Sequence, residues 1–148
     1  MHSSPFKSLR GRIALAALLG VLACGRPPGE EALAHLPGYW EIEAVEFPNG
    51  ESRDYAANSA IDYYHLEGRK GYLKKLQPEA NGRYLASDDA LPLEVLSRNG
   101  RLYLRFEGEE SAWEEEVLEL GPDHLVTRHE NGLHYRYRRY VPLQIPQS

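Results

Sequence analysis

Four Asn-Gly pairs recur along the chain and limit strongly what it can fold into. They stand at positions 49–50, 81–82, 99–100 and 131–132, between short segments that contain many apolar and aromatic residues. Asn and Gly both tolerate positive φ angles, so a two-residue Asn-Gly loop is the strongest short-range signal for a β-hairpin. No amphipathic helix of about 12 residues stands out in the same region. The sequence therefore predicts an all-β domain built from consecutive hairpins.

The segments between these turns read as short strands. About eight or nine such strands favour a closed, up-and-down antiparallel β-barrel, because closure removes exposed sheet edges. A sandwich of two sheets is the structural alternative. The expected strands are Tyr39–Phe47, Ala60–Leu66, Gly71–Gln77, Arg83–Ser87, Pro92–Arg98, Arg101–Glu107, Trp113–Leu120, His124–Glu130 and Leu133–Tyr140.

The Asn99-Gly100 hairpin predicts its own register. With these two residues as the loop, Leu93 pairs with Phe106 and Val95 pairs with Leu104 on one apolar face. The opposite face is mostly polar. A shift of one residue would mix the two faces, so this register is strongly favoured.

The same analysis of the Asn131-Gly132 loop pairs Val126 with Tyr137 and His129 with His134. Directly opposed histidines, with Cβ atoms about 5 Å apart, can share a metal ion, but two ligands are too few for a site. We therefore expect a solvated histidine pair and no metal centre. Together the two hairpins predict an inward-facing set of Leu93, Val95, Leu102, Leu104, Phe106, Val126 and Tyr137.

The N-terminus has the pattern of a secretory signal. Lys7, Arg10 and Arg12 precede an apolar run from Ile13 to Ala23. At about 1.5 Å per residue this run is too short to cross a hydrocarbon core of about 30 Å as a helix. The sequence predicts a signal peptide over residues 1–23 rather than a permanent membrane span.

Cys24 is the only cysteine of the chain and ends the segment Val21-Leu22-Ala23-Cys24. This segment resembles the lipobox of bacterial lipoproteins. The resemblance implies that cleavage leaves Cys24 first, that its thiol carries a lipid with acyl chains such as palmitate, and that Gly25 after it favours the outer membrane. More than one acyl chain gives stable anchoring, and the leaflet stays open.

The remaining chain divides into a tether, a domain and a tail. Residues 24–35 contain Arg26-Pro27-Pro28-Gly29, a short semi-rigid linker, and Glu30–Leu36 is expected to form one or two helical turns. The β-barrel domain is expected over residues 36–142. Residues 143–148 form a C-terminal tail.

Two motifs near opposite ends of the domain resemble one family. Gly38-Tyr39-Trp40 is similar to the Gly-x-Trp start of lipocalin-type barrels, and Tyr135–Tyr140 is similar to the basic, aromatic last strand of small lipocalin-like lipoproteins of Bacteroidota. The resemblance covers roughly residues 36–140. It implies a lipocalin-like barrel in which Trp40 lies across one end and Arg139 covers it through a cation–π contact.

Charge and motif content argue against nucleic-acid binding and catalysis. The chain has a formal net charge of −5, and its signal segment carries no acid, so the domain is acidic and repels phosphate backbones. Glu114-Glu115-Glu116 and Asp88-Asp89 are interpreted as solvated acids, because neighbouring strand residues point to opposite faces and aspartate favours turns. The sequence contains no nucleophile motif, phosphate loop or metal-ligand spacing. We expect no catalytic residue and no cofactor.

Tyrosine is in excess, with 10 Tyr against 3 Phe and 2 Trp. A buried tyrosine needs a partner for its hydroxyl group, so these side chains either end at the surface or line a partly polar pocket. The candidates for lining a ligand pocket are Tyr63, Tyr72, Tyr103 and Tyr137.

These features together predict a lipid-anchored, lipocalin-like barrel of the outer membrane that binds a small amphipathic ligand or an envelope protein without catalysis. The alternative is a structural accessory subunit of an outer-membrane protein complex with no ligand cavity. An eight-stranded barrel either fills its interior with side chains or holds one small ligand, so the sequence leaves both functions open.

Overall fold

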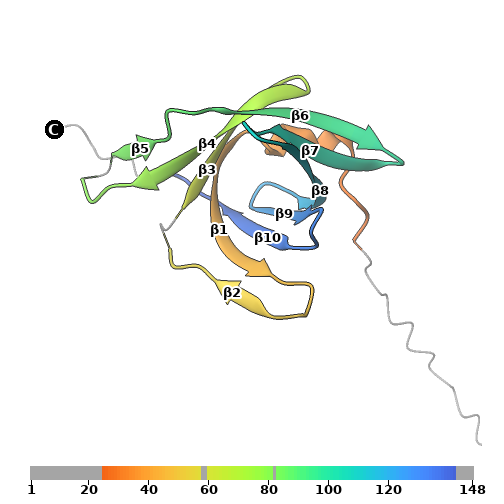
Figure 1. The fold of residues 1–148 in the computed structure, drawn as a ribbon, viewed down its shortest axis with the longest axis horizontal. Coiled ribbons are helices and arrows are strands. Elements are labelled where there is room, and N and C mark those ends of the chain that lie inside the picture. Colours follow the sequence, from red (N-terminus) through yellow and green to blue (C-terminus); the bar gives the residue numbers. More distant parts are fainter. Residues whose placement is uncertain (1–24, 58–59, 82, 143–148) are drawn as a thin grey trace, which may run out of the picture.

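The computed structural model describes residues 25–57, 60–81 and 83–142, so the expected signal peptide, Cys24 and the C-terminal tail lie outside the described residues. The described chain forms a short 3₁₀ helix, η1 (Glu30–His35), and ten strands in one antiparallel sheet (Figure 1). The strands are β1 (Gly38–Glu46), β2 (Ser52–Asp54), β3 (Ile61–Glu67), β4 (Lys70–Pro78), β5 (Tyr84–Ala86), β6 (Leu91–Arg98), β7 (Arg101–Glu107), β8 (Ala112–Leu120), β9 (His124–His129) and β10 (His134–Arg139).

Eight of these strands close into a barrel. Neighbours follow the order β1-β3-β4-β6-β7-β8-β9-β10, and β10 pairs again with β1, where Trp40 lies opposite Arg139. Figure 1 shows the ring of strands, with the short strands β2 and β5 outside it. The all-β, up-and-down antiparallel lipocalin-like barrel expected from the sequence is confirmed. The sandwich alternative is wrong, because the sheet closes on itself.

The hairpin between β6 and β7 has the predicted register. Leu93 pairs with Phe106, and Val95 pairs with Leu104. The loop residues Asn99-Gly100 have φ angles of 52° and 73°, the left-handed conformation that a two-residue type I′ loop requires. All four paired side chains are buried, so turn chemistry and burial favour the same register.

The register predicted for the hairpin between β9 and β10 is wrong by one residue. Tyr137 pairs with Leu125 rather than with Val126. A shift of one residue reverses the two faces of a strand. Leu125 and Thr127 are therefore fully buried inside the barrel, whereas Val126, expected to face inward, is only half-buried.

A three-residue loop explains this shift. The N–H of His129 donates to the carbonyl of Leu133 at 2.8 Å, and the N–H of Gly132 donates to the carbonyl of His129 at 2.8 Å. Gly132 alone in this loop has a positive φ angle, of 88°. That pattern is typical of a type I turn followed by a glycine bulge, not of a two-residue loop. The expected cross-strand pair of His129 and His134 is therefore not formed.

The two ends of the barrel differ. η1 covers one end, where the carboxylate of Glu30 accepts hydrogen bonds from Arg69, in the β3–β4 turn, and from Ser97, near the end of β6. We call this the closed end. The β7–β8 and β9–β10 turns lie at the other end, which we call the open end.

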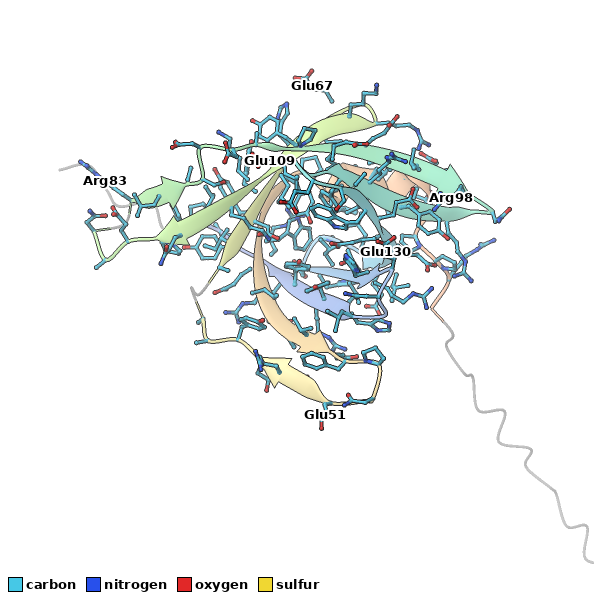
Figure 2. All side chains as sticks on the ribbon, in the orientation of Figure 1. Glu51, Glu67, Arg83, Arg98, Glu109 and Glu130 are labelled. Atoms are coloured by element: carbon cyan, nitrogen blue, oxygen red, sulfur yellow. The ribbon has the colours of Figure 1, made fainter. Side chains whose placement is uncertain are left out.

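Inward-facing apolar side chains fill the ring, while Glu67, Arg83 and Arg98 project outward at its periphery (Figure 2). The burial pattern alternates along all of β7 and from Pro92 to Leu96 in β6, as expected for strands with one face in a core. The fully buried apolar residues of the core include Leu36, Trp40, Val95, Leu104, Phe106, Val117 and Leu125.

Trp40 occupies the closed end. The ring is fully buried, and its Nε1–H donates to the carbonyl of Leu36 at 2.8 Å. The guanidinium of Arg139 lies 3.8 Å from the centroid of the Trp40 ring system. Arg139 also donates hydrogen bonds to the carbonyls of His35 and Pro37. This one side chain therefore ties the last strand to η1 and to the start of β1.

Gly38 is expected to be required for this closed end. Its φ angle is +116°, and an added Cβ atom would lie 2.9 Å from Nη1 of Arg139. Gly38→Ala should therefore lower the free energy of unfolding by about 1–3 kcal/mol, as measured by urea titration. Gly25→Ala is the matched control, because nothing lies within 4 Å of its added Cβ atom. Equal stability of the two variants would contradict the role of Gly38.

Candidate functional site

An ion pair joins the interior of the barrel to its rim at the open end. Asp62 on β3 lies opposite Trp40, on the inner face, and only 4% of its side chain is exposed. Nζ of Lys75, on β4, lies 2.7 and 2.9 Å from the two carboxylate oxygens, while 64% of the lysine side chain is exposed. Lys75 therefore reaches from the rim of the barrel into its interior.

Asp62 is held in a setting that disfavours its charged form. Burial raises the pKa of Asp62, although the charge and hydrogen bonds of Lys75, and a hydrogen bond from Tyr137, act in the opposite direction. Tyr64 and Tyr137 are buried beside it, and burial raises the pKa of both hydroxyl groups well above the ordinary value. Both tyrosines thus remain protonated hydrogen-bond donors at neutral pH.

Glu115 is a second carboxylate in the same interior. It pairs with Leu104, whose side chain faces the core. The hydroxyl of Thr127 donates to Oε2 of Glu115 at 2.7 Å, and Nε1–H of Trp113 donates to Oε1 at 3.4 Å. No ion pair of Glu115 is found in the described part of the chain.

Aromatic rings accompany these carboxylates at the open end. Trp113 stacks on Phe106 with ring centroids 5.3 Å apart, and both Trp113 and Tyr135 are only half-buried where they pack on the core. Burial, followed by the negative charge of Glu115, raises the pKa of Tyr135. We call the polar set at this end the mouth cluster; its members are Asp62, Lys75, Glu115, Thr127, Tyr135 and Tyr137.

A pocket of about 460 Å³ opens at the rim next to Lys75. This volume lies in the range of small-molecule sites, about 300–1,000 Å³. Its lining residues are Ala60, Lys75, Leu76, Gln77, Leu85, Ala86 and Ser87. Two other pockets involve the outer wall: one of about 360 Å³ beside Tyr103, and one of about 720 Å³ between the linker and β8.

Of the four tyrosines expected to line a pocket, only Tyr137 lies inside the barrel. Tyr63 and Tyr72 are half-buried on the outer face, because their neighbours Tyr64 and Leu73 face the core. Tyr103 is also on the outer face, where the guanidinium of Arg98 lies 4.2 Å from its ring centroid. Tyr103 lines the outer pocket of about 360 Å³.

The outward-facing rings form a continuous row across β1, β3 and β4. Ring centroids are 4.8 Å apart between Tyr39 and Tyr63, 6.3 Å between Tyr63 and Tyr72, and 4.9 Å between Tyr72 and His65. We call these four residues the outer aromatic row. Their mutual packing explains why large side chains on the solvent side of a barrel are only half exposed.

Apart from Tyr135 and Tyr137, which belong to the excess of tyrosine, the members of the mouth cluster were missed at the sequence level. The interpretation of Glu114-Glu115-Glu116 as solvated acids fails for Glu115, which faces inward. Glu116 is on the outer face but is covered by Arg101 and Arg128, whose hydrogen bonds outweigh the effect of burial and lower its pKa. The alternation of Trp113, Glu115 and Val117 was the available signal, since it places the middle glutamate on an apolar face.

The buried position of Asp62 predicts an unusual pH dependence. Its folded pKa is raised, so the folded state binds more protons than the unfolded state above the ordinary pKa of 3.8. The free energy of unfolding of the wild type, relative to Asp62→Asn, should therefore fall as the pH rises from 3.8 through the raised value. Urea titrations of both proteins at a series of pH values measure this difference.

Lys75→Met tests whether Lys75 moderates the raised pKa of Asp62. It removes the cation that favours ionised Asp62, so the fall in stability relative to Asp62→Asn should become larger and extend to higher pH. A difference that rises with pH, or that is unchanged by Lys75→Met, would contradict this account.

The described part of the chain contains neither a cluster of metal ligands nor a membrane-crossing helix. Within residues 25–57, 60–81 and 83–142, no group of three or more His, Cys, Asp or Glu side chains is arranged to hold a metal ion. No helix in the same ranges has the length and hydropathy needed to span a bilayer.

Comparisons with known proteins give structural neighbours only. No protein-family model matches the chain, and no curated protein matches its sequence. A lipocalin-like protein from Bacteroides uniformis is 13% identical, with a TM-score of 0.48, over 72% of this chain and 99% of that chain. A protein from Bacteroides eggerthii is 13% identical, with a TM-score of 0.47, over 71% and 99% of the two chains.

A lobster protein, apocrustacyanin A1, is 16% identical, with a TM-score of 0.45, over 75% of this chain and 64% of that chain. All these TM-scores are below 0.5, so the fold of this chain is established by its own strand pairing. That pairing makes the chain a closed, eight-stranded, antiparallel lipocalin-like barrel.

Proposed function

We propose that this protein is a lipid-anchored binding protein of the bacterial outer membrane, which holds a small amphipathic ligand at the open end of its barrel without catalysing a reaction. The mouth cluster carries the proposal. It places carboxylate, hydroxyl and ammonium groups next to half-buried aromatic rings and above an apolar core. An amphipathic molecule needs both kinds of partner, since its polar end must be hydrogen-bonded where it leaves water.

The position of the linker supports the same function. Only Gly25–Gly29 separate Cys24 from η1, and five residues span at most about 18 Å. A lipid on Cys24 therefore keeps the closed end near the membrane surface. The mouth cluster, at the opposite end of the barrel, then faces away from the anchor and towards solvent.

The alternative, an accessory subunit of an envelope protein complex, is favoured by a different surface. The outer aromatic row is a half-buried surface of contiguous rings on the outside of the barrel. Aromatic residues of this kind are enriched where proteins bind one another. This surface is separate from the barrel interior. The two functions are therefore distinguished by whether a small molecule or a protein partner remains bound when the protein is purified.

Native mass spectrometry of the full chain, extracted gently from membranes, tests the proposal. A mass increment from a retained small molecule is expected, and Glu115→Gln together with Tyr135→Ala should reduce its occupancy. Tyr72→Ala, on the outer aromatic row, is the matched control and should leave occupancy unchanged. A stoichiometric protein partner with no small molecule would support the accessory subunit instead. Loss of the small molecule in Tyr72→Ala alone would also contradict binding at the mouth.

A further inference from the structure

The two carboxylates of the mouth cluster have different partners. Asp62 has a cation, Lys75, within hydrogen-bond distance of both carboxylate oxygens. Glu115 has only the neutral donors Thr127 and Trp113. Glu115 thus lies on the inner face of the barrel, and no cation of the described residues lies within ion-pair distance of it.

By strand register, His129 is the basic residue best placed to pair with Glu115, but its ring makes a different hydrogen bond. It pairs with Glu115 across β8 and β9. Its Nδ1 accepts a hydrogen bond from the N–H of Asn131 at 3.1 Å, which requires that nitrogen to be unprotonated. The ring of His129 is therefore engaged with its own loop, and no ion pair between His129 and Glu115 is found in the described part of the chain.

The position of Glu115 suits a cationic partner. Its side chain is half-buried on the inner face of β8, where Thr127, itself fully buried, and Trp113 donate hydrogen bonds to it. A carboxylate taken partly out of water is destabilised unless a cation pairs with it. A ligand that brings a positive charge gains the most from this position.

Aromatic rings beside Glu115 favour a particular kind of cation. Trp113 donates to Glu115 through its indole N–H, and Tyr135 packs on the core at the same end. The faces of Trp and Tyr attract cations, and organic ammonium groups are recognised by such rings together with a carboxylate. The stacking of Trp113 on Phe106 provides an apolar surface where an attached hydrocarbon chain can pack.

We infer that the ligand taken up at the open end is an organic cation, an amphiphile with an ammonium head group that pairs with Glu115. This inference rests on the proposed function and adds the chemical class of the ligand. Glu115 is the specificity-determining residue, because it supplies a carboxylate with no cation of the described residues within ion-pair distance, and Trp113 and Tyr135 contribute ring faces and apolar contact.

Three probes with the same six-carbon chain test the inference: hexyltrimethylammonium, hexanol and hexanoate. They are titrated into the full chain in nanodiscs at pH 7, with calorimetry and tryptophan fluorescence as readouts and empty nanodiscs as the blank. Hexyltrimethylammonium is expected to bind about tenfold more tightly than hexanol, and hexanoate more weakly than both. Added NaCl should weaken the binding of hexyltrimethylammonium, leave that of hexanol unchanged and not weaken that of hexanoate, because it screens attraction and repulsion alike.

Glu115→Gln should reduce the affinity for hexyltrimethylammonium by about tenfold while leaving that for hexanol within about twofold. Glu119→Gln is the matched control, because it removes one negative charge from β8 at a side chain that is 62% exposed. In Glu119→Gln the three probes should keep the order of affinity that they have in the wild type. If Glu115→Gln does not fold, the order of the probe affinities in the wild type and their salt dependence decide whether the ligand is a cation.

The outcomes separate this inference from the proposed function. Equal affinity for the three probes, or a preference for hexanoate, overturns the cationic ligand but leaves a binding barrel. Binding of none of them, together with no retained small molecule in native mass spectrometry, overturns both. A loss of preference in Glu119→Gln equal to that in Glu115→Gln would mean that the overall charge, rather than Glu115, selects the cation, and also overturns the inference.

Discussion

Trp40→Ala is expected to lower the free energy of unfolding by about 3–5 kcal/mol, because it leaves a large cavity at the closed end of the barrel. The ring is fully buried, so its removal takes away packing on all sides. It also leaves the carbonyl of Leu36 without its indole donor and Arg139 without the ring that it covers. Domains of this size are stable by about 5–15 kcal/mol, so the variant should unfold at much lower urea concentration.

Urea titration followed by circular dichroism measures this loss. Leu85→Ala, at a side chain that is 58% exposed, is the matched control and should change stability by no more than about 0.5 kcal/mol. Trp40→Phe should fall between the two, because it retains a ring under Arg139 but loses the N–H donor. A loss below about 1 kcal/mol in Trp40→Ala would show that Trp40 does not seal the barrel.

Cys24→Ser is expected to abolish lipid attachment and to release the protein from the membrane. The thiol of Cys24 is the group that the lipobox resemblance identifies as the acylated one, and a hydroxyl is a much weaker nucleophile than a thiolate. The apolar run before it is too short, at about 1.5 Å per residue, to act as a span in place of the lipid. Metabolic labelling with an alkyne-bearing fatty acid, followed by membrane fractionation, measures both effects.

Cys24→Ala separates the lost thiol from an effect of the new hydroxyl group. It should behave as Cys24→Ser does, without label and outside the membrane fraction. Gly25→Ala, next to the modified residue, should remain labelled. Label retained on either Cys24 variant, or membrane association without label, would contradict the lipoprotein interpretation and the orientation of the barrel that follows from it.

The β6–β7 hairpin illustrates what the sequence determined by itself. The Asn99-Gly100 pair favours one loop type, and the alternation of apolar residues on both sides favours one register, so a local and a burial preference agreed. The recurrence of Asn-Gly pairs between short apolar segments was enough to predict the all-β class and an antiparallel barrel. The short strand β2 was missed, because Ser52–Asp54 is exposed and has no apolar alternation.

The β9–β10 hairpin shows where such local information fails. An Asn-Gly pair is compatible with both a two-residue loop and a three-residue loop that ends in a glycine bulge, and the two differ by one residue in register. The neighbouring segments alternate less clearly, so burial could not decide between them. Packing decided instead: Leu125 and Thr127 fill the interior, and Val126 is left on the outer wall.

The candidate site depended still more on the tertiary structure. The sequence determined the composition of the site, with its excess of tyrosine and its run of glutamates, but not which members face inward. Glu115 differs from Glu114 and Glu116 only in the side of β8 on which it lies. Tyr64 and Tyr137 lie in the interior, whereas Tyr63 and Tyr72 lie outside. Local propensities and periodicity are properties of short segments, whereas the faces that become interior are decided when β10 pairs with β1 and the sheet closes.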